Sequence, residues 1–470
     1  MENCVQQYLR DRGYTVNEKA YTIIEEAGRW YRAEKVEAHT RKTVSAEEYE
    51  LPRMGFAKRA AADDANLCEV IEINVGQSTD KNGEPMQGTD QEWVLTQLAA
   101  NSFDTQYREQ LELTSAEGTV ACYVRLANAE QMTDGTVRGG EIRINYISAS
   151  GFIPLTVENK EVLEAAFWGK SFADTAEEIT LVICTLDDKN NYQYETVVFE
   201  KSGKVKAPAV LQTLGDVKPF AVMRTAEVNN IENMVGFGYP KVYGTIPVFQ
   251  ALDEAFGGFF FDVKDSKSMT FLNEKVCGFD EAGQPIPPNK ELKRQFVFLG
   301  DKLPGADSLI KRDTPEIRVG SFQQSIEMLL SMMSLKFGYG TKKYSFENGQ
   351  ITTATEYIGE RQDMMQELNK QRFQARQYIE GIIRALLWFD NTYNKANHDL
   401  EQEIMIQFDD SYIESKADRL ESIRQDVAAG IGGKNVERLY LKEKYNLTDE
   451  DAAAWAGEDT EPADSEGGGA

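Results

Sequence analysis

The segment from Ile351 to Asn391 has the pattern of one long amphipathic helix, and no other feature of the sequence constrains the fold as strongly. It contains no proline. Ten positions separated by steps of four and three residues form a single helical stripe, and eight of the ten are apolar. They are Ala354, Ile358, Arg361, Met365, Leu368, Arg372, Ala375, Ile379, Ile382 and Leu386.

Thr353 and Glu356 form a capping-box pattern at the start of this helix. A helix from Thr353 to Asn391 would be about 58 Å long, which exceeds the diameter of an ordinary small domain. Two interpretations follow: a core helix of a large α-rich domain, or a strut that links layers of an assembly.

The charge balance limits the kinds of partner. The 470 residues are enough for two to four domains or one multi-layer protomer, and an apolar content of 41% is enough to bury a core. The chain has 51 basic and 77 acidic side chains, a net charge of −26. Broad non-specific binding of nucleic acid needs cations that displace counterions, so we expect any contact with DNA to be local or transient.

Cysteine and histidine usage excludes several kinds of site. The five cysteines are far apart and form no CxxC pair, which predicts small buried side chains in a reducing compartment. They are Cys4, Cys68, Cys122, Cys184 and Cys277. The two histidines, His39 and His398, are expected at the surface, which argues against zinc sites and His-based catalytic triads. The sequence has no signal-peptide core and no long apolar run, so we expect neither secretion nor a membrane span.

Motifs for catalysis are missing. The pair Gly433-Lys434 follows Ala428 and precedes Asn435, so it fails as a phosphate-binding P-loop. GxSxG and HExxH are absent. Three acidic pairs could hold a divalent cation, although adjacent carboxylates in an acidic protein are expected to be solvated. These pairs are Asp63-Asp64, Asp187-Asp188 and Asp409-Asp410. We therefore predict no enzyme activity, no cofactor and no metal site.

The amino-terminal half predicts an α+β domain. Helical patterns occupy residues 17–42, 55–67 and 91–100, and a loop rich in turn-forming residues occupies 74–90. Alternating or β-branched segments predict strands. These cover residues 68–75, 119–126, 141–147, 165–172, 178–185 and 192–200.

Two helices flanking an insertion form a second organising feature. The first covers residues 248–264 and contains Gly257-Gly258, which indicates close packing on a neighbour, a bend, or simply a weak helix. The second begins at Ser321, where Gln324 completes another capping-box pattern. The insertion between them carries a hairpin pattern, FDEAGQPI, and a strand pattern, QFVFLG. The two helices can pack antiparallel and hold the insertion at their tip.

The remaining segments surround the long helix. A glycine-containing loop at 337–351 precedes it, and a strand at 403–408 follows. Three short helices are predicted at 416–429, 435–445 and 448–455. The last segment, GEDTEPADSEGGGA, is acidic and glycine-rich and is expected to be disordered.

The order of these segments resembles the portal proteins of tailed bacteriophages, in particular the siphophage type that includes the portal of Bacillus phage SPP1. The most specific stretch is YSFENGQITTATEYIGERQDMMQELNKQRFQ. Similar pieces are MGFAKRAAADDANLCEVIEINV, EIRINYISASGFIPLTVEN, PKVYGTIPVFQALDEAFGGFFFDV and FDDSYIESKADRLESIRQDVAAGIGGKNVERLYLKEKYNLTDEDAA. The resemblance spans Asn17 to Trp455.

The resemblance implies an α+β protomer of a ring, typically a homododecamer, at one capsid vertex. Its parts would be a wing at 1–243, stem helices at 244–264 and 321–337, and a clip at 265–320. A tunnel loop at 338–351 would lead into the long helix at 352–396. A strand at 397–410 would return to the wing, followed by a helical crown at 411–457 and a disordered acidic tail at 458–470.

The resemblance also implies function and location. Double-stranded DNA would pass through the ring during packaging and ejection, and the terminase large subunit would dock on the clip before a head–tail adaptor protein replaces it. Capsid and scaffold proteins would be further partners. The protein would assemble in the host bacterial cytoplasm and reside in the virion, with no membrane involved. The alternatives are a metal-dependent nucleic-acid-processing enzyme and another phage structural ring protein, such as an adaptor.

Three groups of site residues follow as hypotheses. In the tunnel loop, brief contact with DNA is weighed against a solvated turn for Lys342, Lys343, Tyr344, Asn348 and Gln350. In the clip, partner binding is assigned to Glu281, Gln284, Lys290, Lys293 and Arg294. On the long helix, Arg361 and Arg372 interrupt the apolar stripe and could pair with acidic groups of the same or the next subunit.

Overall fold

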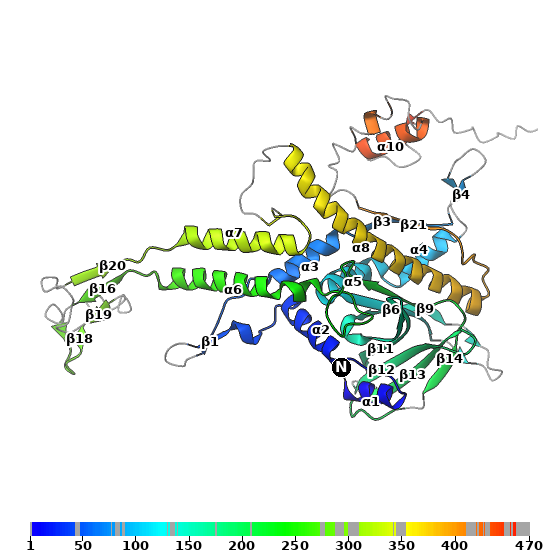
Figure 1. Ribbon diagram of the computed structural model, residues 1–470, viewed down its shortest axis with the longest axis horizontal. Coiled ribbons are helices and arrows are strands. Elements are labelled where there is room, and N and C mark those ends of the chain that lie inside the picture. Colours follow the sequence, from blue (N-terminus) through cyan, green and yellow to red (C-terminus); the bar gives the residue numbers. More distant parts are fainter. Residues whose placement is uncertain are drawn as a thin grey trace, which may run out of the picture. The chain divides into compact units, whose positions relative to one another are not determined.

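The computed structural model is a mixed α+β protein (Figure 1). It describes residues 2–42, 48–76, 78–79, 85–86, 90–128, 130–131, 137–138, 140–173, 176–206, 209–272, 278–286, 296–298, 310–341, 343–344, 354–409, 420, 423–425, 427, 433–445, 452 and 455–456. The chain forms two compact units. The larger comprises Met1–Cys68 and Ile73–Met405, and the smaller comprises Glu69–Glu72 and Ile406–Ala470.

A five-stranded antiparallel sheet forms one layer of the larger unit. Its strands, in spatial order, are β10 (Phe152–Glu158), β11 (Glu161–Ala173), β12 (Ala176–Leu186), β13 (Tyr192–Glu200) and β14 (Val210–Thr213). Ile179, Leu181 and Ile183 alternate along β12, and this period places all three on one face. Helix α1 (Asn3–Asp11) covers that face with Val5 and Leu9. The sequence predicted three of these strands and missed β10 and β14.

A three-stranded sheet supports the long helix. Its order is β15 (Phe220–Arg224), β6 (Thr119–Ala127) and β9 (Glu141–Ser148). Helix α8 (Ala354–Phe389) packs on β15 and β6, and a short π-helical segment, Asp390–Asn394, continues it. At Gly381 a Cβ atom would lie 3.1 Å from that of Ala221, so glycine permits this close approach.

The predicted apolar stripe of α8 is buried over the second half of the helix. Leu368, Ala375, Ile379, Ile382 and Leu386 are each at most 2% exposed. Tyr378, also buried, reaches towards Gln110 of α5 (Phe103–Glu117), so the sheet and α5 enclose this half as a core helix. Thr353 and the side chains of 354–363 lie outside the described residues, and the first capping box with them.

The amino-terminal helices are α2 (Glu18–Tyr31), α3 (Phe56–Asn66) and α4 (Gln91–Ala100). The predicted helix over 17–42 was wrong beyond Tyr31. Ala33 has a φ of 51°, and the Glu34 N–H donates to the carbonyl of Arg29, which closes a Schellman-type end. Such an end favours glycine. Because alanine occupies the position here, the sequence did not indicate that the helix ends. A 3-10 turn, η1 (Glu37–His39), and a hairpin of β1 (Thr40–Lys42) and β2 (Glu48–Glu50) follow.

Helices α6 (Lys241–Asp265) and α7 (Val319–Lys336) lie side by side as an antiparallel pair, here called the arm (Figure 1). Phe249 contacts Phe337 at one end, and Asp262 binds Arg318 at the other. A Cβ atom on Gly257 would meet Leu51, and one on Gly258 would meet Phe322, at 2.9 and 3.0 Å. The glycine pair therefore serves close packing, one of the alternatives that the sequence left open.

Both arm helices begin earlier than predicted. Helix α6 starts at Lys241 instead of residue 244 or 248, because Gly244 and Pro247 are accommodated inside it. The predicted capping box at Ser321 was wrong, since α7 starts at Val319 with Arg318 as its N-cap. Asp262 of α6 caps it instead: it accepts the Arg318 N–H at 3.0 Å and pairs with the guanidinium at 2.9 Å. The neighbouring helix supplies the cap, which local sequence does not reveal.

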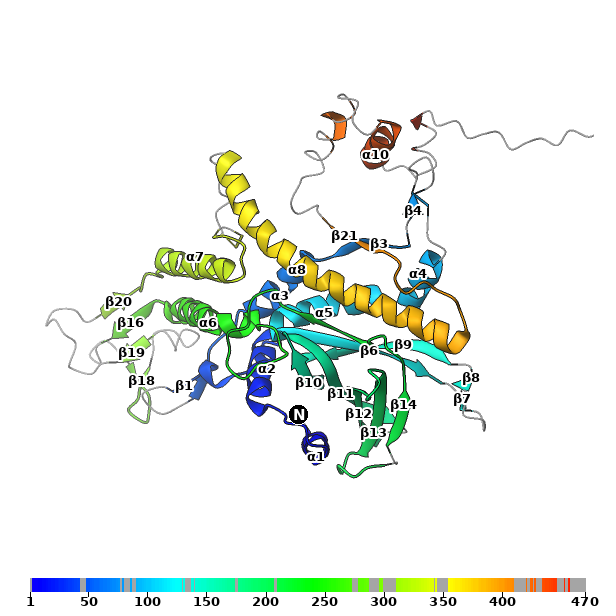
Figure 2. The same ribbon diagram turned by 45° about the vertical axis from the view of Figure 1, so that its right-hand side comes forward.

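The insertion carries small β elements at the far end of the arm (Figure 2). Strands β16 (Met269–Leu272), β19 (Phe296–Phe298) and β20 (Ile310–Asp313) form one sheet in the order β19-β16-β20. The predicted hairpin is confirmed as β17 (Gly278–Phe279) and β18 (Pro285–Ile286). Asp280 closes its turn by accepting from the N–H groups of Ala282 and Gln284.

Shorter elements complete the description. Pairs of strands are β3 (Val70–Val75) with β21 (Ile404–Phe408), β4 (Ser78–Thr79) with β5 (Pro85–Met86), and β7 (Glu130–Gln131) with β8 (Val137–Arg138). A 3-10 turn, η2 (Ala149–Gly151), precedes β10, and α10 (Gly433–Tyr445) belongs to the smaller unit. The predicted acidic tail lies outside the described residues, as do most of the helices predicted at 416–429 and 448–455.

Two expectations from composition have structural outcomes. Cys68, Cys122 and Cys184 are buried as predicted, Cys4 is half-buried, and Cys277 lies outside the described residues. Among the helices of the described chain, none combines the length and the apolar content that a membrane crossing needs.

Candidate functional site at the base of the arm

Lys241, the first residue of α6, is the centre of a buried group of charges at the base of the arm. The residue is 2% exposed. Its Nζ atom lies 3.2 Å from Asp64 Oδ1, 3.5 Å from Glu367 Oε1 and 4.0 Å from Glu227 Oε1. Burial alone would lower the pKa of Lys241, but the three carboxylates outweigh it and raise that pKa. Lys241 is therefore a buried ammonium ion that joins α3, α6, α8 and the segment after β15.

Helix α3 supplies two of the acidic groups. Asp63 and Asp64 are 4% and 8% exposed, so the expectation that this pair is solvated was wrong. Asp64 lies one helical turn after Ala60 and Ala61, both fully buried, and this spacing puts its carboxylate on the packed face. Arg59, one turn before Asp63, holds that carboxylate with two contacts of 2.9 Å. Both acids are thus buried with charged partners, the form in which buried carboxylates persist.

The chain after α7 is tied to the same two carboxylates. The Tyr339 hydroxyl donates to Asp64 Oδ1 at 2.9 Å, and the Tyr344 hydroxyl donates to Asp63 Oδ2 at 2.9 Å. Lys343 Nζ lies 3.9 Å from the centre of the Tyr339 ring, within cation–π range. Burial raises the pKa of both tyrosines, whereas Lys343 is exposed. We call this set of nine residues the arm-base cluster: Arg59, Asp63, Asp64, Glu227, Lys241, Tyr339, Lys343, Tyr344 and Glu367.

The arm-base cluster fixes the place where the predicted tunnel loop begins. Gly338, with a φ of 79°, turns the chain away from α7, and a Cβ atom there would lie 3.0 Å from Glu367 Cγ. Lys343 and Tyr344 are brought together by the structure, whereas Lys342, Asn348 and Gln350 lie outside the described residues. The carboxylates accept the hydroxyl protons of both tyrosines and are themselves paired with Arg59 and Lys241. This arrangement is suited to holding α3, α6 and the chain after α7 together.

The other predicted site residues lie elsewhere. Glu281 and Gln284 are exposed on the turn between β17 and β18, while Lys290, Lys293 and Arg294 are outside the described residues. The Arg361 side chain is also outside them. Arg372 is half-buried on α8 and close to Cys68, where burial raises the thiol pKa to about 12 and the guanidinium offsets part of that effect. Arg372 therefore lies close to Cys68 of its own chain, and its pairing with a neighbouring subunit stays a prediction.

Both histidines lie against carboxylates, His39 buried and His398 half-buried, so the prediction that they lie at the surface was wrong. His39 is 2% exposed, and its Nε2 lies 2.9 Å from Asp253 Oδ2. His398 lies between Asp90 Oδ1, at 2.8 Å, and Asp390 Oδ2, at 2.7 Å. Burial would lower the pKa of His398, but the two carboxylates raise it. The partners are far away in sequence, which is why the sequence did not reveal them.

The remaining acidic pairs do not form a metal site in the part of the chain that the structure describes. Asp187 accepts the N–H groups of Lys189 and Asn191 and so closes a turn, while Asp410 lies outside the described residues. Among the described side chains, no group of three or more His, Cys, Asp or Glu is placed to hold a metal ion.

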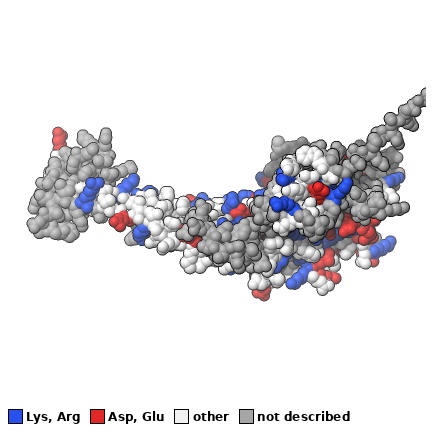
Figure 3. All heavy atoms as spheres, turned by 90° about the horizontal axis from the view of Figure 1, so that it is seen from above, with Lys and Arg blue, Asp and Glu red and all other residues white. Residues whose placement is uncertain are grey.

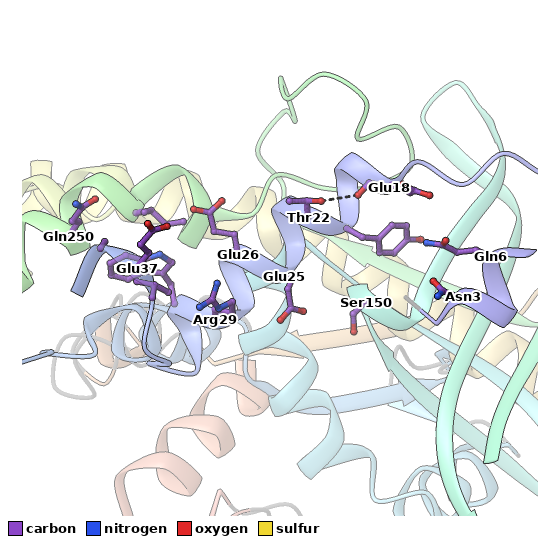
Figure 4. A pocket seen from close by; sticks show the side chains of 15 residues that line it. Asn3, Gln6, Glu18, Thr22, Glu25, Glu26, Arg29, Glu37, Ser150 and Gln250 are labelled. Atoms are coloured by element: carbon purple, nitrogen blue, oxygen red, sulfur yellow. Dashed lines mark hydrogen bonds between the residues drawn. The ribbon is translucent and has the colours of Figure 1, made fainter. Parts of the chain in front are cut away.

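Sequence reasoning also missed a surface hollow of about 870 Å³ beside α2 (Figure 4). Four glutamates from α2 and η1 line it together with Arg29: Glu18, Glu25, Glu26 and Glu37. Ser150, just before β10, lies on its wall. The charged face of α2 was visible in the sequence, but it matches no motif, so it did not predict the hollow. We call this feature the acidic hollow.

Comparisons with known proteins add one solved structure to this description. No family model and no curated protein matches the chain. A similar solved structure is the neck of a native GTA particle computed with C12 symmetry. It shares 8% sequence identity, covers 85% of this chain and 89% of its own, and has a TM-score of 0.38. A likeness of this size does not establish a common function.

Proposed function

We propose that this chain is the subunit of a portal ring of the siphophage type, at the capsid vertex of a tailed bacteriophage. The ring, typically of twelve copies, is the channel through which double-stranded DNA enters the capsid and leaves it. The observation that carries this proposal is the arm: two antiparallel helices hold a β module at one end, and a charge cluster ties them to the long helix at the other. The order of the arm helices, the β module and the long helix agrees with the order of stem, clip and long helix that the resemblance implies, and this agreement supports the proposal.

The surface of the arm supports assembly into a ring. Large apolar side chains are exposed on both of its helices, among them Phe260 and Val263 on α6 and Met328, Met332 and Leu335 on α7. Met328 and Leu335 are 61% and 62% exposed. In the view of Figure 3, the exposed part of the arm shows few Lys, Arg, Asp or Glu side chains. Exposed apolar side chains that gather on one element favour an interaction site, and neighbouring arms in a ring would cover them.

The arm-base cluster supports a role for the loop that follows α7. In the proposed ring this loop faces DNA, which must slide, so tight phosphate contacts would oppose movement. Lys343 is held over the Tyr339 ring and near Asp63, where its charge is offset within the subunit. The proposed loop is therefore held firmly where it begins, and brief phosphate contact by Lys342 stays a prediction.

The partners follow from the same proposal. The terminase large subunit docks on the insertion, where Glu281 and Gln284 are exposed, and a head–tail adaptor protein later takes its place. Capsid and scaffold proteins surround the ring, which assembles in the host cytoplasm and remains in the virion. The proposed activity is that of a conduit and docking platform without catalysis of its own.

Complementation of a phage that lacks this chain tests the proposal. We expect heads made without it to contain no DNase-protected genome, and expression of the chain in trans to restore packaging. Heads that fill normally without the chain and then leak would assign it to a later structural ring, such as an adaptor. A magnesium-dependent nuclease activity that disappears on changing Asp409 and Asp410 would favour the enzyme alternative instead.

A further inference from the structure

A second hollow, of about 510 Å³, collects cationic side chains on the surface of this acidic protein. It lies between the β10–β11 turn, β15 and the middle of α8. Four cationic and two anionic side chains line it, although the chain as a whole has a net charge of −26. The cations are Lys160, Lys218, Arg224 and Arg384, and the anions are Glu161 and Glu380. We call it the basic hollow.

The cations of the basic hollow are bonded mainly to backbone carbonyls. Lys218 donates to the carbonyl of Val162 at 2.6 Å, Arg224 to that of Lys160 at 2.6 Å, and Arg384 to that of Leu400. Between residues that the structure describes, the one ion pair here joins Lys218 to Glu161 at 3.3 Å, and the Glu161 side chain is 66% exposed. Carbonyl groups satisfy the hydrogen-bond donors but leave most of the positive charge unbalanced.

Electrostatics agrees with this geometry. Burial lowers the pKa of both Lys218 and Arg224, and Glu161 offsets only part of the effect. At Lys241 the balance is the reverse, because three carboxylates surround it. An added anion in the basic hollow would be stabilised by cations that are already held in place, at little further cost in side-chain entropy.

The rim of the basic hollow carries a lysine at a position that favours glycine. Asn159 and Lys160, the two residues between β10 and β11, have φ values of 47° and 67°. Two consecutive positive values define a type I′ turn, which strongly prefers glycine at its second position. The chain thus keeps a cation at the rim although the backbone there favours a residue without a side chain.

The acidic hollow lies at the other end of the same strand. Ser150, two residues before the start of β10, lines the acidic hollow, and Asn159, directly after β10, lines the basic one. Strand β10 itself has seven residues and is about 23 Å long at the usual rise per residue, and Gly151 lies between it and Ser150. A closed ring needs such a pair of different, complementary surfaces, because each subunit contacts its two neighbours through opposite sides.

We infer that the basic hollow receives carboxylates of a second copy of this chain, supplied by the exposed α2 glutamates at the acidic hollow, Glu25 and Glu26. This inference rests on the proposed ring and adds the contact that orients one subunit on the next. A cationic patch meeting an anionic patch speeds association and fixes the register. Glu161 and Glu380 in the lining disfavour a dense polyanion such as duplex DNA, and they leave room for a few carboxylates.

Charge reversal with rescue tests the inference on the full-length chain. Lys160→Glu and Glu26→Lys change exposed side chains that make no described ion pair, and Lys189→Glu, on the β12–β13 turn, is the matched control. We expect each hollow variant to raise the concentration needed for ring assembly at least tenfold, measured by sedimentation velocity. The double variant Lys160→Glu/Glu26→Lys should return to within about threefold of wild type. Far-UV circular dichroism confirms that each chain is folded.

The outcomes separate this inference from the ring itself. If the wild type forms rings and Lys160→Glu assembles as well as Lys189→Glu, the proposed interface is wrong, but the proposed ring is not. A double variant that assembles no better than the single ones would overturn it as well. Tight binding of a fluorescent DNA duplex, lost in Lys160→Glu with assembly unchanged, would assign the hollow to nucleic acid instead. If the wild type remains a single subunit at every concentration, the proposed ring itself is wrong.

Discussion

The arm-base cluster holds a buried cation and the basic hollow holds half-buried ones, and the two regions balance these charges in different ways. Lys241 has three carboxylates within 4.0 Å, all from its own chain. Lys218 and Arg224 have backbone carbonyls and one exposed glutamate. The pKa of Lys241 is raised, whereas those of Lys218 and Arg224 are lowered. In the arm-base cluster the charges of one subunit balance each other. In the basic hollow the positive charge is balanced by an anion of another subunit.

The largest expected effect comes from removing the central cation of the arm-base cluster. Lys241→Met leaves the buried Asp64 and the half-buried Glu227 and Glu367 without their shared partner, so we expect a loss of about 3–5 kcal/mol in the free energy of unfolding. Urea unfolding measures it. Lys370→Met is the control, because Lys370 also pairs with Glu367 but is 61% exposed, and we expect less than about 1 kcal/mol there. A loss at Lys241 no larger than at Lys370 would contradict the comparison.

Glu117 extends the comparison to a buried acid, since among the described residues it has no cation close to it. Burial raises the pKa of Glu117 to about 7, with Arg32 offsetting part of the effect. The folded state therefore binds its proton more tightly than the unfolded state. Stability from this group is fully present below about pH 4.5 and is lost as the pH rises to about 7.

Glu117→Gln should remove this slope. Relative to wild type, we expect the variant to gain about 2–3 kcal/mol between pH 4.5 and pH 8, measured as the difference between urea unfolding curves. Glu112→Gln, on the same helix, is the control for a glutamate that has a cation, Lys58. A difference between Glu117→Gln and wild type that does not change with pH would show that Glu117 is ionised in the folded protein.

The charge of protonated His398 is balanced by two aspartates, and this charge depends on pH. Each of its ring nitrogens faces an aspartate, so a doubly protonated ring is needed to donate to both. Its folded pKa is raised, so its stabilisation is present below the unfolded value of 6.5 and is lost as the pH rises through the folded pKa. We expect His398→Gln to cost about 1–2 kcal/mol at pH 6 and less at pH 9. Proton NMR can follow the titration, since the chain has only two histidines. A His398 midpoint below 6.5 would contradict this account.

The smallest effect is expected in the basic hollow. Lys218→Met removes a cation whose one carboxylate partner, Glu161, is largely solvated, so we expect less than about 1 kcal/mol in the single subunit. The comparison with Lys241→Met is direct, because both replace a lysine by a side chain of similar length. A loss at Lys218 equal to that at Lys241 would show that the two regions do not differ.

The sequence predicted those parts of the fold that depend on local periodicity. The buried stripe of α8, the paired helices of the arm and the hairpin around Asp280 are confirmed because each depends on neighbours in sequence. Ala33 ends α2 in a conformation that favours glycine, so it gave no signal. Asp262 caps α7 from another helix, 56 residues before Arg318, and no local pattern records that.

The candidate site was predicted only in part. Lys343 and Tyr344 were identified from their loop, but their partners Asp63 and Asp64 were expected to be solvated. The position of Asp64 beside buried alanines was visible in the sequence, and it was the useful signal. Lys241 carried no signal, because its three partners lie on segments that are between 14 and 177 residues away.

Electron microscopy of the purified full-length chain tests the central claim most directly. We expect closed rings, typically of twelve copies of the 52.9 kDa subunit, with the arms side by side around a central channel. Particles of one subunit mass at every concentration, with no rings in the images, would contradict the account.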